Sequence, residues 1–135
     1  MKRQTYQVAV IGTGPAALMA ADVISSSGFE VSIFEKRNTP ARKLLIAGSS
    51  GLNVTHAMPV EKFPTKYSGA PAFWSNLFSL FSPKDWIEFI HQLGIKTFKG
   101  TSERYFVEGM KASSLVANWK ERLSERGVKW LFNKR

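Results

Sequence analysis

The chain has 135 residues, a formal net charge of +9, 44% hydrophobic residues and no cysteine. This composition is typical of a globular domain with a core, and it excludes disulfide frameworks, thiolate zinc sites and dithiol redox chemistry. The positive charge favours anionic partners such as nucleotides, nucleic acid or acidic membranes, although lysine and arginine are scattered along the whole chain.

The first part of the sequence predicts a strand, a helix and a second strand. Residues 6–11 are rich in β-forming side chains and end at a glycine, as a buried strand does. Residues 15–27 are rich in alanine and end in serines followed by Gly28, which predicts a helix. Residues 30–35 predict the next strand. Such short connections indicate the start of a parallel α/β sheet with flanking helices.

The rest of the chain predicts further elements around a long loop. Residues 42–47 predict a short helix, and residues 48–71 are punctuated by proline and glycine, which indicates a loop. Ser82 and Asp85 fit a capping box at the start of a helix. In chain order, we expect helices over 73–81, 82–93 and 112–126, and strands over 95–99, 104–107 and 128–132.

A glycine-containing turn joins the first strand to the first helix. Gly12, Gly14 and Ala17 form a G-x-G-x-x-A pattern, in which the glycines allow a tight turn and the close approach of a pyrophosphate. Glu35 ends the second strand, about 20 residues further on, where an acid binds ribose hydroxyls. The pattern predicts a dinucleotide site but does not separate FAD from NAD. An ordinary α/β turn without a dinucleotide is the alternative.

The segment RKLLIAGSSGLNVTH, residues 42–56, is a second and more specific motif. Together with the first motif, Glu35-Lys36 and residues 110–113, it resembles the HI0933-like (BaiN-like) family of NAD(P)/FAD-dependent oxidoreductases, in a branch with the pattern GLNxTH. The resemblance implies a Rossmann-like FAD/NAD(P)-binding domain over residues 1–135. We expect this N-terminal portion to be incomplete, with residues 57–111 as an insertion of loops and helices and no second complete domain.

The resemblance also implies which residues bind FAD. Arg42 and Lys43 would lie near the phosphates or ribose, and the loop from Gly48 to Thr55 would run along the pyrophosphate and the flavin. The chain departs from the family pattern at Ser49, Ser50, Gly51-Leu52 and Val107. The expected cofactor-binding residues are Gly12, Thr13, Gly14, Pro15, Ala16, Ala17, Glu35, Lys36, Arg42, Lys43, Gly48, Ser49, Gly51, Asn53 and Thr55.

The family resemblance implies hydride transfer from NAD(P)H through FAD to an acceptor that the sequence does not identify. One alternative is an RNA-directed, flavin-dependent reduction of uridine, which the positive charge would suit. Another is a non-catalytic nucleotide-binding fragment, because family members are much longer. We assign no catalytic residue, and the two histidines, His56 and His91, have no paired acids that would make a metal site.

The sequence further predicts a cytoplasmic protein that does not enter a membrane. No stretch is long and apolar enough to span a bilayer, and glycines and Pro15 interrupt the apolar run near the N-terminus, so that it does not resemble a signal peptide. We therefore interpret the Asn53-Val54-Thr55 glycosylation pattern as a coincidence.

Overall fold

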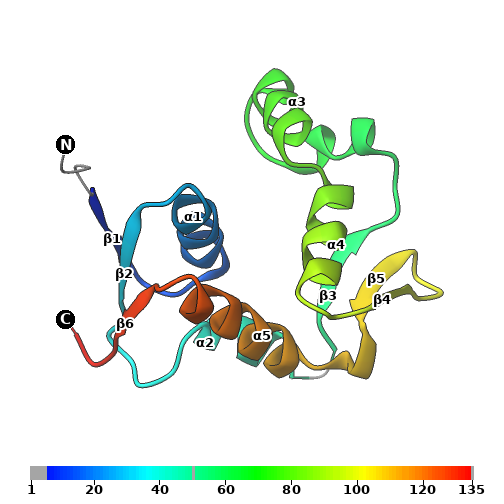
Figure 1. The fold of residues 1–135 in the computed structure, drawn as a ribbon. Helices are drawn as coiled ribbons and strands as arrows, with labels where there is room; N and C mark the ends of the chain where they lie inside the picture. The colour runs from blue at the N-terminus through cyan, green and yellow to red at the C-terminus, as the bar shows by residue number, and fades with distance from the viewer. Residues whose placement is uncertain (1–5, 50, 135) are drawn as a thin grey trace. The chain divides into compact units, whose positions relative to one another are not determined.

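The structure, a computed structural model, describes residues 6–49 and 51–134 and divides into two units (Figure 1). Unit 1 consists of residues 1–48 and 112–135, and unit 2 consists of residues 49–111. Each unit contains one three-stranded sheet. Ser50, one of the positions at which the sequence departs from the family pattern, lies outside the described residues.

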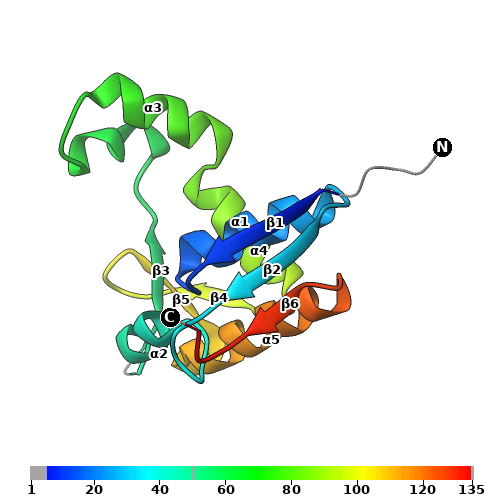
Figure 2. The same ribbon diagram turned by 90° about the vertical axis from the view of Figure 1, so that its left-hand side faces the viewer.

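The sheet of unit 1 is parallel, as the sequence predicts. It contains β1 (Gln7–Ile11), β2 (Glu30–Phe34) and β6 (Lys129–Leu131), and β2 lies between the other two strands (Figure 2). Both pairings meet at Ile33, which is opposite Val10 on one side and Trp130 on the other. The order places the carboxyl ends of β1 and β2 side by side, where an open α/β sheet binds its ligands.

Three helices belong to unit 1: α1 (Pro15–Ser26), α2 (Arg42–Ala47) and α5 (Ala112–Glu125). Their positions agree with the predicted helices to within a residue or two at each end. The large apolar residues of α5, which are Leu115, Val116, Trp119 and Leu123, are all buried. The fully buried side chains of this core include Leu18, Val31, Ile33, Leu115, Trp119 and Leu123.

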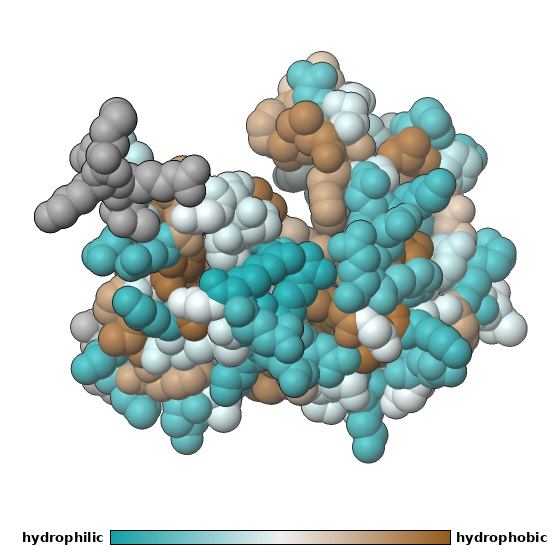
Figure 3. Space-filling view, in the orientation of Figure 1, coloured by the Kyte–Doolittle hydropathy of each residue, from teal (hydrophilic) through white to brown (hydrophobic). Residues whose placement is uncertain are grey.

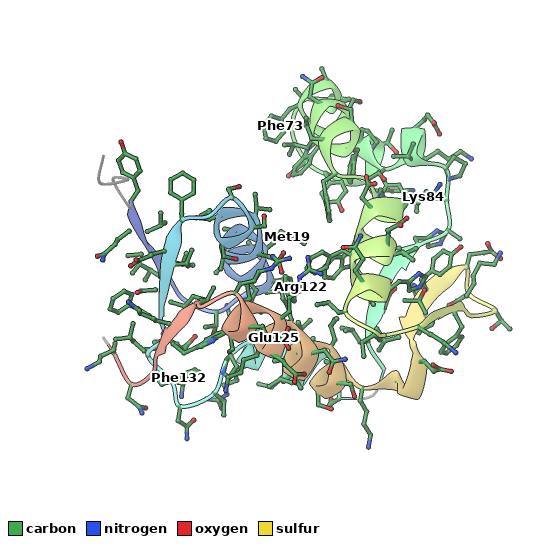
Figure 4. The ribbon with its side chains drawn as sticks, in the orientation of Figure 1. Met19, Phe73, Lys84, Arg122, Glu125 and Phe132 are labelled. Carbon is green, nitrogen blue, oxygen red and sulfur yellow. The ribbon has the colours of Figure 1, made fainter. Side chains whose placement is uncertain are left out.

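An ion pair crosses this core between α1 and α5. Asp22 is a buried acid on α1, and one of its carboxylate oxygens lies 3.1 Å from Nε of Arg122. The other oxygen lies 2.7 Å from Nη1 of Arg126. Arg122 lies on α5 and extends toward α1 (Figure 4), and Arg126 directly follows the helix. The pair explains why an acid stands inside the otherwise apolar first helix.

The sheet of unit 2 is antiparallel. Its order is β3 (Asn53–His56), β5 (Arg104–Val107) and β4 (Thr97–Lys99). The sequence predicted the last two strands, but the prediction of a loop throughout residues 48–71 is wrong. That stretch contains β3 and the 3-10 turns η1 (Val60–Lys62) and η2 (Pro64–Lys66). A strand as short as β3 has too weak a pattern of its own, and its pairing with β5 defines it.

Unit 2 also contains α3 (Pro71–Leu80), α4 (Pro83–Gln92) and the 3-10 turn η3 (Glu108–Met110). The predicted capping box is confirmed, since the Asp85 amide donates to Ser82 Oγ and the Ser82 amide donates to the Asp85 carboxylate. By contrast, α3 buries no residue, and apolar side chains lie on the surface over it (Figure 3). Within the described part of the chain, no helix combines the length and apolar character that crossing a membrane requires.

Candidate dinucleotide site

The turn after β1 leads into α1 and is hydrogen-bonded to the end of the neighbouring strand β2. Gly12 has a φ of +91°, a conformation that glycine adopts without the strain of a Cβ. Its amide donates a hydrogen bond of 2.7 Å to the carbonyl of Phe34 at the end of β2. The glycine therefore fixes the path of the chain from β1 into α1.

Neither the backbone conformation nor the packing of the protein requires a glycine at position 14. Its φ of −67° and ψ of 167° are extended backbone that any residue adopts, and a Cβ built there meets nothing within 4 Å. The space that a Cβ would fill lies at the start of α1, where no side chain caps the helix. Backbone amides and the helix dipole favour an anion at such a position. The open space and the uncapped helix start together favour an anionic ligand here.

A pocket of about 510 Å³ lies at this point. Its volume is within the range of small-molecule sites, roughly 300–1,000 Å³. All the residues that line it belong to unit 1. They are Thr13, Gly14, Pro15, Glu35, Lys36, Arg37, Ala41, Arg42, Lys43 and Ile46.

Four basic side chains line this pocket: Lys36, Arg37, Arg42 and Lys43. All four are exposed, and none of the ion pairs found among residues 6–49 and 51–134 involves them. Glu35 is the one acid in the lining. The excess of positive charge suits a ligand with two phosphates.

Glu35 is held in place by two hydrogen bonds. Thr13 Oγ1 donates to one carboxylate oxygen, and the amide of Arg37 donates to the other at 2.9 Å. Thr13 Oγ1 also accepts a bond of 3.0 Å from the amide of Ala41, the residue before α2. The Thr13 hydroxyl therefore links the turn after β1, the acid after β2 and the start of α2.

The same hydrogen bonds stabilise the charged form of Glu35, a residue that is only 9% exposed. Burial by itself raises the pKa of Glu35. Hydrogen bonds from Thr13 and from the amides of Arg37 and Lys36, with the charge of Lys36, outweigh burial and lower the pKa below its ordinary value. Glu35 is therefore ionised at neutral pH and can accept hydrogen bonds from hydroxyl groups.

The remaining residues of the first predicted motif lie on the first turn of α1. Ala16 is exposed and Ala17 is half-buried. Gly48 ends α2 and is buried, and a Cβ there would collide with the side chain of Ala112 on α5. Gly48 therefore has a packing role within unit 1, which accounts for a glycine at this position.

Four residues of the second predicted motif belong to unit 2. Ser49 is exposed, and Gly51 lies where a Cβ would meet the end of the Met110 side chain. Asn53 and Thr55 are on β3, and Thr55 lines a different pocket, within unit 2. The cofactor contacts of these four residues stay a prediction.

Sequence reasoning missed three residues of the pocket, Arg37, Ala41 and Ile46. Arg37 was not assigned, although it directly follows Glu35-Lys36 and its basic side chain was the available signal. Ala41 carries no signal at all, because an alanine with a φ of +51° is defined only by its surroundings. Its amide bond to Thr13 and its burial support that conformation.

The comparison with family models decides the identity of the fold. The model of the HI0933-like protein Rossmann domain matches residues 6–135. The chain belongs to this family. The match covers both units, and it agrees with the family that the two sequence motifs resemble.

Curated proteins match this HI0933-like chain over short stretches. Thiamine thiazole synthase of Thermotoga maritima is 52% identical over 33 residues, which cover 24% of this chain and 13% of that protein. A probable ferredoxin/ferredoxin–NADP reductase of Mycobacterium bovis is 49% identical over 41 residues, which cover 30% of this chain and 7% of that protein. The aligned stretches are thus a small part of these relatives.

Solved structures share the fold of this HI0933-like chain over nearly its whole length. A 3-ketosteroid-Δ4-(5α)-dehydrogenase from Rhodococcus jostii RHA1 has a TM-score of 0.67 at 13% identity, covering 100% of this chain and 40% of that one. THI4 from Thermovibrio ammonificans has a TM-score of 0.61 at 16% identity, covering 95% and 38%. At such identities the likeness shows the fold alone, and this chain spans less than half of either structure.

Thr13→Val removes the hydroxyl that links Glu35 and Ala41 but keeps the shape of the side chain. Two buried partners lose a hydrogen bond, so we expect destabilisation of about 2–4 kcal/mol at pH 7. Because the folded-state pKa of Glu35 is lowered, its stabilising contribution is present above the unfolded pKa and is lost as pH falls through the folded value. Urea unfolding between pH 7 and pH 3 measures this effect. The difference in the free energy of unfolding between wild type and Thr13→Val should become smaller as the pH falls.

Thr13→Ser is the matched control, since it keeps the hydroxyl. It should retain most of the stability and the wild-type pH dependence. A valine variant with the same pH profile as wild type would contradict the assigned role of the Thr13 hydroxyl.

Proposed function

We propose that this chain is the FAD-binding portion of a flavin-dependent oxidoreductase. The observation that carries the proposal is the open space beside Gly14, at the uncapped start of α1, on a pocket with four basic side chains. Membership of the HI0933-like family supports it, and so do the relatives whose names are those of a reductase and a dehydrogenase.

Each part of the pocket has a role in holding the cofactor under this proposal. The amides at the start of α1 would bind the pyrophosphate. The Glu35 carboxylate uses one site on each oxygen for Thr13 and Arg37, and its other lone pairs would accept the ribose hydroxyls. Lys36 and Arg42 would offset the phosphate charge. FAD, when bound, supplies the hydride-transfer chemistry, with NAD(P)H as the proposed donor.

The direct test is the visible spectrum of the purified protein, followed by denaturation and identification of any released flavin. The proposal predicts a flavin absorption band and FAD, and the fragment alternative predicts a colourless protein that added FAD does not stabilise. Loss of the band on adding NADH or NADPH without oxygen would support the donor. A flavoprotein whose band neither nucleotide changes would refute the donor and leave FAD binding intact.

Glu35→Gln tests the ribose assignment. The amide keeps the size of the side chain and one acceptor oxygen but loses the charge, so we expect FAD to bind about tenfold more weakly. Fluorescence titration of the apoprotein with FAD measures this, and circular dichroism confirms the fold. Unchanged affinity in a folded variant would refute the assignment of Glu35 to the ribose.

A further inference from the structure

Unit 2 has a pocket of its own, of about 330 Å³. The end of β3 forms one side of it through Thr55 and His56, the last residues of the GLNVTH motif. The start of α4, which packs on β3, contributes Lys84 (Figure 4). The assignment of FAD to unit 1 leaves this pocket without a role.

The charge of the pocket favours an anion. Lys84 is the one charged residue among those that line it, and no acid does so. Among the ion pairs of residues 6–49 and 51–134, none involves Lys84. The nearest acid in sequence, Asp85, accepts hydrogen bonds from the amide and hydroxyl of Ser82 within the capping box. The helix start is thus capped by its own residues, and Lys84 carries the positive charge available to a ligand.

Other residues that line the pocket offer hydrogen-bond donors. Nδ1 of His56 accepts a bond of 3.0 Å from the amide of Met58, so the proton of the neutral ring is on Nε2, which is then a donor. Thr55 and Tyr105, whose side chains carry hydroxyl groups, also line the pocket. A carboxylate accepts several such bonds at once.

The rest of the lining is apolar and includes Met58, Val60 and Ile87. A single lysine matches one negative charge, and the apolar residues match a hydrocarbon body. We propose that this pocket binds a small organic carboxylate with an apolar body. The inference goes beyond the proposed function, and binding here requires no flavin.

The test uses the full chain, labelled with ¹⁵N, and benzoate as the probe, with amide chemical shifts as the readout. Benzoate should cause saturable shifts at Thr55, His56 and Lys84, while benzamide, its uncharged counterpart, should cause far smaller ones. Lys84→Met should weaken benzoate binding about fivefold, the value of one exposed ion pair. Lys96→Met, which removes an exposed lysine of unit 2 that does not line the pocket, should leave it unchanged.

Three results would overturn the proposal. Shifts that do not saturate, or that map to unit 1, would show that benzoate does not bind this pocket. Equal affinity for benzoate and benzamide would show that the pocket recognises no charge. Equal affinities of the Lys84→Met and Lys96→Met variants would remove Lys84 from the recognition of the ligand.

Discussion

Gly14→Val is expected to weaken FAD binding about a hundredfold while the protein remains folded. The valine side chain would occupy the open space at the start of α1 and keep the pyrophosphate from the backbone amides, with the loss of about two hydrogen bonds to a charged group. Since the backbone of Gly14 is extended and nothing surrounds its Cβ position, stability should change by less than about 1 kcal/mol. FAD titration and urea unfolding of the same preparations measure the two effects.

Gly14→Ala provides the graded comparison. Its single methyl group should give an intermediate loss of affinity with even less effect on folding. If the folded valine variant binds FAD as wild type does, the cofactor does not approach this turn, and the proposed site is wrong.

Asp22→Asn is expected to destabilise the protein because it breaks the ion pairs of Asp22. The amide keeps the shape of the side chain but removes the charge that pairs Asp22 with Arg122 on α5 and with Arg126 just after it. Breaking a buried ion pair destabilises a protein by about 3–5 kcal/mol. Because both arginine side chains are partly exposed, we expect about 2–3 kcal/mol here.

Glu30→Gln is the matched control. It removes the same charge from unit 1, but the Glu30–Lys129 pair is exposed and 3.9 Å long, so the expected loss is below about 1 kcal/mol. Urea unfolding at neutral pH compares the two variants. Equal effects would show that the buried position of Asp22 does not strengthen its ion pair.

The sequence predicted the parts of the structure that depend on local patterns. The turn at Gly12 and Gly14, the acid at Glu35 and the capping box at Ser82 are each defined by a few neighbouring residues. The strand β3 was missed because its identity depends on β5, in a distant part of the chain.

In the candidate site, too, local patterns predicted some features, whereas others depend on tertiary contacts. Residue types and spacing identified Thr13 as a site residue. They could not show that its hydroxyl forms hydrogen bonds within the protein, to Glu35 and to the amide of Ala41. Gly48 was predicted to contact the cofactor, but in the structure it packs against Ala112 at the start of α5. The sequence did not indicate this contact because α5 begins far from Gly48 along the chain. Such roles follow from tertiary contacts that no local pattern contains.

The packing of Gly48 against Ala112 has a consequence for the way in which the chain is assembled. Gly48 is the last residue before unit 2, and Ala112 is the first residue after it. The chain therefore leaves unit 1 and returns to it at nearly the same point. A segment inserted between two residues that are in contact does not strain the domain that carries it. The entropic cost of bringing the two ends of the segment together grows only slowly with its length. We therefore expect unit 1 to tolerate changes in the size of unit 2. During synthesis, β6 can pair with β2 only after the whole of unit 2 has emerged.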